Sequence, residues 1–179
     1  MKVGMIKTLA AIFALALSSS VCAQDFLQQW RDSATKGMNE FRSAHKAGIE
    51  ANGWHFVADA RSAEEVPISD VFVREVKTGD GSIRSAVLLN VFYTPMPGSD
   101  SPEYQSTKAL VWFNCKQGSY EQRNLERYAS ADGSGNPVST TAEKPGSEPI
   151  ELPGADARSI EKPLLAAVCS AKVERTRQE

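Results

Sequence analysis

A series of short segments in which apolar and polar side chains alternate, between residues 53 and 130, constrains the fold of this chain most strongly. Alternation with period two is typical of strands that bury one face. A glycine-rich stretch at 78–82 favours a hairpin turn, and a proline- and serine-rich stretch at 95–106 favours a loop. We therefore expect a sheet built from the segments 53–59, 69–77, 82–94, 107–116 and 119–130.

Helical periodicity marks both ends of the chain. The spacing predicts a helix over 25–48, capped by Asp25 and ended by Gly48, with an apolar face of Phe26, Trp30, Ala34, Met38 and Phe41. We favour packing of this helix on the core; a partner-binding or membrane-surface helix is the alternative. A second helix is predicted within 157–172, where Ile160, Leu164, Leu165 and Val168 form the apolar face. Between them, 131–156 is a long Gly/Pro/Ser/Thr segment whose pieces 138–141 and 149–152 could pair at a sheet edge.

The first 23 residues have the pattern of a secretory signal peptide. Lys2 and Lys7 precede a short apolar run, and a small residue, Ala23, ends the cleavage triplet. We expect cleavage between Ala23 and Gln24. The alternative is cleavage before Cys22 with a lipid on its sulfur, although the branched Val21 fits that signal poorly. The apolar run is too short to span a bilayer, and nothing after residue 23 could do so.

Removal of Cys22 leaves two cysteines, Cys115 and Cys169. Because an exported domain folds under oxidising conditions, we expect one disulfide between them, which would fix the C-terminal helix to the sheet. Closing a loop of this size stabilises a fold by about 4 kcal/mol through chain entropy. Two buried free thiols are the alternative.

The composition gives little sign of chemistry. Without the two leader lysines, 18 basic residues face 22 acidic ones, a net charge of −4 that gives no reason to expect nucleic acid as a partner. His45 and His55 are not spaced as a metal pair. The acidic pairs Glu64 with Glu65 and Glu121 with Glu126 are of a kind that arises by chance. We expect no catalytic residue, no cofactor and no metal site.

Three stretches follow in this order along the chain: "STKALVWFNCK" (106–116), "SYEQRNLERYASADGSGNPV" (119–138) and "ARSIEKPLLAAVC" (157–169). Through them the chain resembles the surface-adhesin E family over about residues 53–169. The matching positions are Ser106, Cys115, Asn124, Leu125, Gly133, Gly135 and Cys169. The resemblance implies an α+β fold: a small antiparallel sheet with a C-terminal helix tethered by the disulfide. The family's namesake is an outer-membrane lipoprotein that binds host matrix and serum proteins. The N-terminal helix lies outside the resemblance.

These observations predict a signal peptide (1–23), an N-terminal helix (24–50), an adhesin-E-like β domain (51–172) and a C-terminal tail (173–179). The favoured function is an exported, non-enzymatic interaction domain of the bacterial envelope, adhesin-like in binding a protein or envelope component. It predicts an exposed patch with Tyr93, Tyr104 and the 131–156 segment. One alternative is a periplasmic small-ligand carrier with an apolar pocket between the first helix and the sheet. Others are a domain without adhesion activity and, last, an enzyme.

Overall fold

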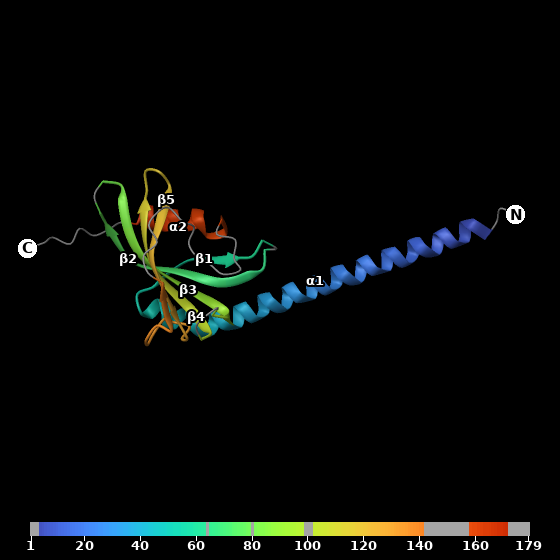
Figure 1. Ribbon diagram of the computed structural model, residues 1–179, viewed down its shortest axis with the longest axis horizontal. Coiled ribbons are helices and arrows are strands. Elements are labelled where there is room, and N and C mark those ends of the chain that lie inside the picture. The colour runs from blue at the N-terminus through green and yellow to red at the C-terminus, as the bar shows by residue number, and fades with distance from the viewer. Residues whose placement is uncertain (1–3, 64, 80, 99–101, 142–157, 172–179) are drawn as a thin grey trace, which may run out of the picture. The chain divides into compact units, whose positions relative to one another are not determined.

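The computed structural model describes residues 4–63, 65–79, 81–98, 102–141 and 158–171 (Figure 1). The elements follow in the order α1 (Gly4–Ala51), β1 (His55–Arg61), β2 (Pro67–Thr78), β3 (Ile83–Met96), β4 (Tyr104–Asn114), β5 (Ser119–Tyr128), β6 (Ser139–Thr141) and α2 (Arg158–Ser170). The chain divides into two compact units, Met1–Gly37 and Met38–Glu179, and every strand named here lies in the second.

The strands form a single antiparallel sheet in the order β1-β2-β3-β4-β5-β6, so each strand pairs with its neighbour in sequence. This confirms the predicted α+β class. The predicted loop at 95–106 is too long, because β3 runs on to Met96 and β4 already begins at Tyr104. The predicted edge pairing of 138–141 is confirmed by β6, whereas 149–152 and the predicted tail 173–179 lie outside the described residues.

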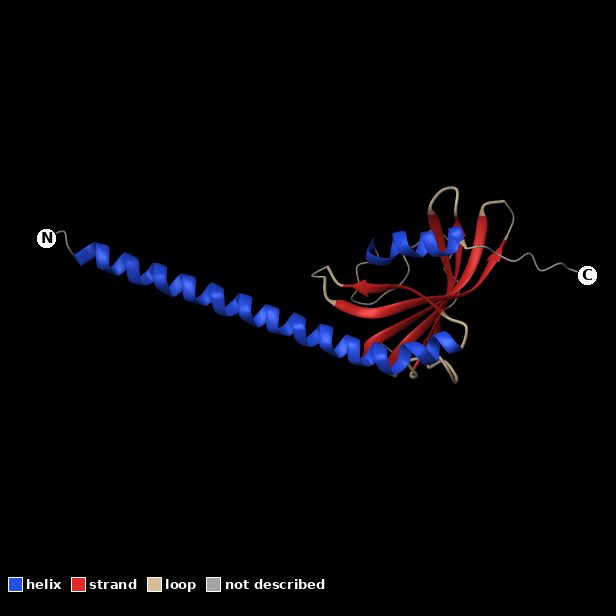
Figure 2. Cartoon of the chain, turned by 180° about the vertical axis from the view of Figure 1, so that it is seen from behind, coloured by secondary structure: helices blue, strands red, loops and turns tan. Residues whose placement is uncertain are grey.

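One face of the sheet packs against α2, as Figure 2 shows. Ile160, Leu164 and Val168 of α2 have no accessible surface, and they meet inward-facing residues of β1 to β5. The predicted apolar face of this helix is therefore confirmed, with Leu165 at its half-buried margin.

Two contacts hold the C-terminal end of α2 against the sheet. A disulfide joins Cys115, just after β4, to Cys169, as predicted. Nη1 of Arg84 donates to the backbone oxygens of Val168 and Ala171, at 2.7 Å each. A cation at this position also interacts favourably with the helix dipole, so the helix end is fixed covalently and electrostatically.

The opposite face of the sheet carries a second core. Ile49 of α1 and Trp54 cluster there with Phe72, Leu89 and Val91, and Phe41 and Phe56 pack at its margin. These side chains form an apolar core between the last turns of α1 and the sheet.

The first helix is longer than the predicted 25–48 at both ends and stops shortly before Gly53, whose φ is +80°. Its predicted packing on the core is confirmed for Met38, which is buried, and Phe41, which is half-buried. Phe26 and Trp30 lie in the first unit and are 67% and 50% exposed.

A β-bulge in β1 changes the predicted faces of that strand. Phe56 pairs with Phe72 but Ala58 pairs with Val71, so Val57 is an extra residue between them. Phe56 therefore packs with the α1-side core and Ala58 with the α2-side core, whereas simple alternation placed both on one face.

Candidate binding surface

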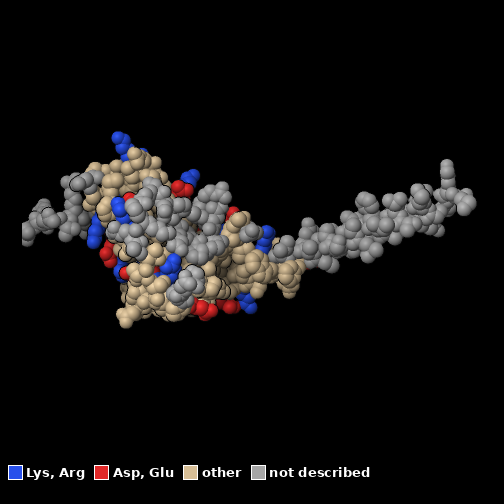
Figure 3. Space-filling view, in the orientation of Figure 1, with Lys and Arg blue, Asp and Glu red and all other residues tan. Residues whose placement is uncertain are grey.

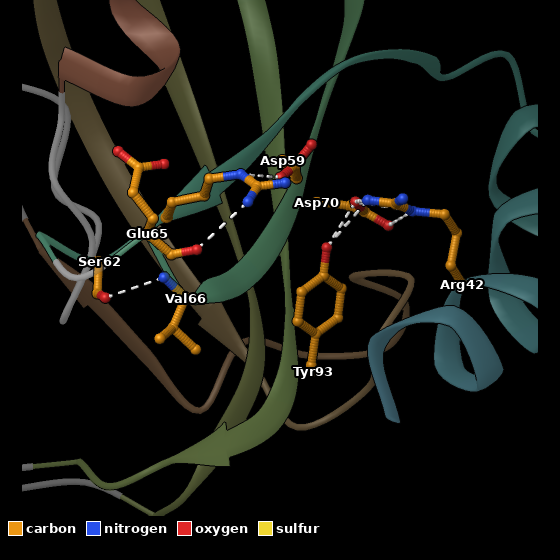
Figure 4. Close-up of polar contacts among 8 residues, drawn as sticks. Arg42, Asp59, Ser62, Glu65, Val66, Asp70 and Tyr93 are labelled. Carbon is orange, nitrogen blue, oxygen red and sulfur yellow. Dashed lines mark hydrogen bonds and ion pairs between the residues drawn. The ribbon is translucent and has the colours of Figure 1, made fainter. Parts of the chain in front are cut away.

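A partly buried ionic network joins the C-terminal part of α1 to the sheet (Figure 4). Nε of Arg42 donates to both carboxylate oxygens of Asp70 (3.1 and 3.0 Å), and Nη2 donates to Oδ1. The Tyr93 hydroxyl donates to the same oxygen at 2.8 Å. Burial, followed by the neighbouring Asp70 charge, raises the pKa of Tyr93 well above its usual value. Because Asp70 is only 2% exposed, this network is internal and has a structural role.

Of the two tyrosines predicted to form a binding patch, Tyr104 is buried and Tyr93 is half-buried. Tyr93 points into the network with Arg42, and Tyr104 is 4% exposed with its ring edge-on to Phe92. Of the 131–156 segment, the structure describes 131–141, where Nζ of Lys108 donates to the oxygen of Gly133 at 2.7 Å. The remainder, 142–156, lies outside the described residues.

Trp112, on β4, is the exposed large apolar side chain among the described residues of the second unit. It alternates with Val111 and Phe113, which have no accessible surface, and so points away from the α2-side core. Its cross-strand neighbours are Ser85 on β3 and Glu121 on β5. A side chain with 44% of its surface exposed at this point of a sheet forms a rigid aromatic platform.

Trp112 lines a shallow hollow of about 280 Å³ at the end of β3, β4 and β5. The other lining residues are Ile83, Asn114, Gln117, Ser119, Tyr120 and Glu121. Nδ2 of Asn114 donates to Oε1 of Gln117 at 2.8 Å, while the Gln117 backbone N–H donates to Oδ1 of Asn114 at 3.2 Å. The two amide side chains thus hold one another in place beside the indole.

Arg123 covers part of the indole. A register shift in the β4–β5 pairing makes Arg123 an extra residue, and Oδ1 of Asn124 accepts the Leu110 backbone N–H at 2.8 Å. The bulge places the Arg123 guanidinium carbon 4.4 Å from the centre of the Trp112 ring. Nη2 of Arg123 also lies 2.9 Å from Oε2 of Glu121, so the charges beside the indole offset one another. We call Trp112, Arg123, Glu121, Asn114 and Gln117 the Trp112 surface.

The other residues considered in the sequence do not converge on a site. His45 is exposed, with Nδ1 3.0 Å from the oxygen of Phe41, and His55 is exposed on β1. Glu121 pairs with Arg123, whereas Glu126 accepts a 2.5 Å hydrogen bond from the Tyr128 hydroxyl. Glu64 lies outside the described residues, and within the described part of the chain no three potential metal ligands cluster.

Trp112 was missed because alternation shows only that it lies on the face opposite Val111 and Phe113, and not which face of β4 is exposed. The available signal was a large aromatic residue at a position where a half-buried strand ordinarily carries a polar one. The bulge that brings Arg123 to the indole leaves no clear mark in the sequence.

The fold and this surface together define a small disulfide-linked β domain with an exposed aromatic platform. Comparison with protein families matches residues 72–170 to surface-adhesin protein E, and the chain belongs to that family. The match includes both cysteines of the disulfide and begins after β1, later than the expected residue 53. Comparison with curated proteins and with solved structures gives no match.

Family membership indicates an adhesin-like surface protein that binds a host or envelope component in a non-enzymatic role. Among the described residues, no helix is both long enough and apolar enough to cross a membrane.

Proposed function

We propose that this chain is an exported, non-enzymatic interaction domain of the bacterial envelope that binds a protein or envelope component through the Trp112 surface. The observation that carries the proposal is an exposed tryptophan, held by a stacked arginine, on the rigid sheet of a surface-adhesin protein E domain. Tryptophan and arginine are enriched among the residues that dominate binding energy at protein interfaces.

The sheet gives this surface its rigidity. Trp112 is flanked in sequence by Val111 and Phe113, both fully buried, so its backbone is fixed by the core. The Arg123 guanidinium lies over the indole, with its carbon 4.4 Å from the ring centre. Because its side chains lose little conformational entropy when a partner binds, such a surface binds with higher affinity than a flexible one of the same area.

Binding is tested with purified exported protein on immobilised extracellular-matrix and serum proteins at micromolar concentration. We expect saturable binding that Trp112→Ala lowers at least about tenfold, as for a central interface residue. Trp30→Ala removes a similarly exposed indole elsewhere and is the matched control. Equal loss in both variants, or none in either, would refute a specific role for the Trp112 surface, and no binding at all would refute adhesion.

The proposal also requires export. We propose cleavage between Ala23 and Gln24, with lipidation at Cys22 as the alternative. The intact mass of the protein from its own cells, measured without reductant, distinguishes the two. A chain that starts at Gln24 is a released periplasmic or secreted domain. A chain that starts at Cys22 with added acyl groups is an anchored lipoprotein, and a chain that retains residues 1–21 contradicts export.

A further inference from the structure

We infer that the chemical group recognised by the Trp112 surface is a neutral saccharide. This inference rests on the proposed function, because it assigns a ligand class to the same surface. Three properties of the hollow support it: an aromatic platform, polar side chains of mixed character and a near-balanced local charge.

The platform suits the apolar side of a sugar ring. A pyranose presents a patch of C–H groups on one face and hydroxyl groups around its rim. An indole with an exposed surface stacks on such a patch through dispersion and through attraction between C–H groups and the negative ring face. Trp112 lines the hollow and keeps 44% of its surface exposed, while Arg123 supports it through the 4.4 Å ring contact.

The polar lining suits the hydroxyl groups of the rim. Each sugar hydroxyl is both a donor and an acceptor, so it is best matched by side chains that offer both. The amides of Asn114 and Gln117 carry donors and acceptors in one plane, and Ser119 adds a hydroxyl to the lining. The 2.8 Å hydrogen bond between the two amides fixes their orientation before a ligand arrives.

The charge pattern favours a neutral sugar over a sulfated one. The Arg123 guanidinium is paired with Glu121 at 2.9 Å and so is not available as an isolated cation. Figure 3 shows basic and acidic side chains interspersed on the face that it presents. The chain without its predicted leader carries a net charge of −4, which repels polyanions. The hollow, at about 280 Å³, lies at the small end of ligand sites and suits the end of a saccharide chain.

The test titrates the exported protein with three probes: N-acetyllactosamine, triacetylchitotriose and a heparin tetrasaccharide. Amide and indole N–H shifts are followed by NMR. We expect saturable shifts with at least one neutral probe, centred on the Trp112 indole and the Asn114 and Gln117 amides, and weaker or no shifts with heparin. Trp112→Ala should lower the affinity at least about tenfold, Gln117→Ala should lower it several-fold, and Trp30→Ala should leave it unchanged.

The outcomes separate this inference from the proposed function. If none of the neutral probes shifts the Trp112 signals while Trp112-dependent protein binding persists, the saccharide inference is wrong and the interaction surface stands. If heparin alone binds there, the ligand is an anion and the inference is also wrong. If neutral probes bind with equal affinity to the wild type and Trp112→Ala, the assigned site is wrong. If substitution of Trp112 changes neither saccharide nor protein binding, the proposed function fails as well.

Discussion

Substitution of Arg42 by alanine should destabilise the protein by roughly 3 kcal/mol, because it leaves the Asp70 carboxylate buried without its cation. Removal of one partner from a buried ion pair typically costs about 3–5 kcal/mol. The Arg42 side chain is a quarter exposed, so water can partly replace its guanidinium beside Asp70. The expected cost therefore lies at the lower end of that range. The Tyr93 hydroxyl would remain as a donor, but one hydrogen bond does not offset the desolvation of a carboxylate with 2% exposure.

The assay is urea unfolding followed by circular dichroism, with the slope of free energy against urea compared between variants to check that two-state behaviour is retained. Arg31→Ala is the matched control, because it removes an exposed arginine from the same helix, and it should change stability by less than about 0.5 kcal/mol. The double substitution of Arg42 by methionine and Asp70 by leucine should cost less than Arg42→Ala alone, since no charge is left buried. A loss below about 1 kcal/mol for Arg42→Ala would refute the role assigned to the network.

Three further predictions concern the stability of the β domain. Replacing Cys115 and Cys169 by serine opens a loop whose ends are 54 residues apart in sequence. This should lower the free energy of unfolding, measured in urea, by about 4 kcal/mol. A loss under about 1 kcal/mol would contradict the chain-entropy argument. Gly133→Ala should destabilise the protein more than Gly135→Ala. Both glycines have positive φ, but only at Gly133 would a Cβ lie 2.5 Å from a lysine carbon. Equal changes in melting temperature for the two variants would contradict this. Burial, followed by the hydrogen bond of its hydroxyl to a glutamate, raises the pKa of Tyr128 to about 12. The contribution of Tyr128 to stability is therefore complete below about pH 10 and is lost as the pH rises through about 12. Tyr128→Phe should flatten this alkaline decline in stability, and an unchanged decline would contradict the prediction.

The features that local patterns determine were predicted well. Alternation located the strands of the sheet, and the 3.6-residue period located the face of α2 with Ile160, Leu164 and Val168. The disulfide was predicted from the even number of cysteines left in a chain expected to be exported. Each of these depends on residues that lie close together in sequence or on a count, so no knowledge of the register between strands is needed.

The features that depend on strand register were not predicted. The bulge at Val57 moves Ala58 to the other face of the sheet, and a shift of one residue reverses every side chain beyond it. The hydroxyl of the half-buried Tyr93 is engaged by Asp70, 23 residues earlier, and by Arg42, on another element. Such a polar cluster is assembled by tertiary packing and leaves no periodic signal.

The candidate site shows the same division. Alternation on β4 places Trp112 on the face opposite Val111 and Phe113 without showing which face is exposed, and its partner Arg123 reaches the indole only through a bulge in β5. The hollow also brings together Ile83, the first residue of β3, and Gln117, in the turn between β4 and β5. Its lining could therefore be assembled only once the strands were aligned.

The most direct test of the proposed binding surface is tryptophan oxidation footprinting of the protein without residues 1–23, with and without a bound matrix component. The chain has three tryptophans: Trp112 and Trp30 are exposed and Trp54 is 3% exposed. Without a partner, we expect oxidation at Trp112 and Trp30 and little at Trp54. With the partner bound, oxidation of Trp112 should fall several-fold while that of Trp30 stays unchanged. Protection of Trp30 with Trp112 still oxidised would contradict the assignment of the binding surface to β4 and β5.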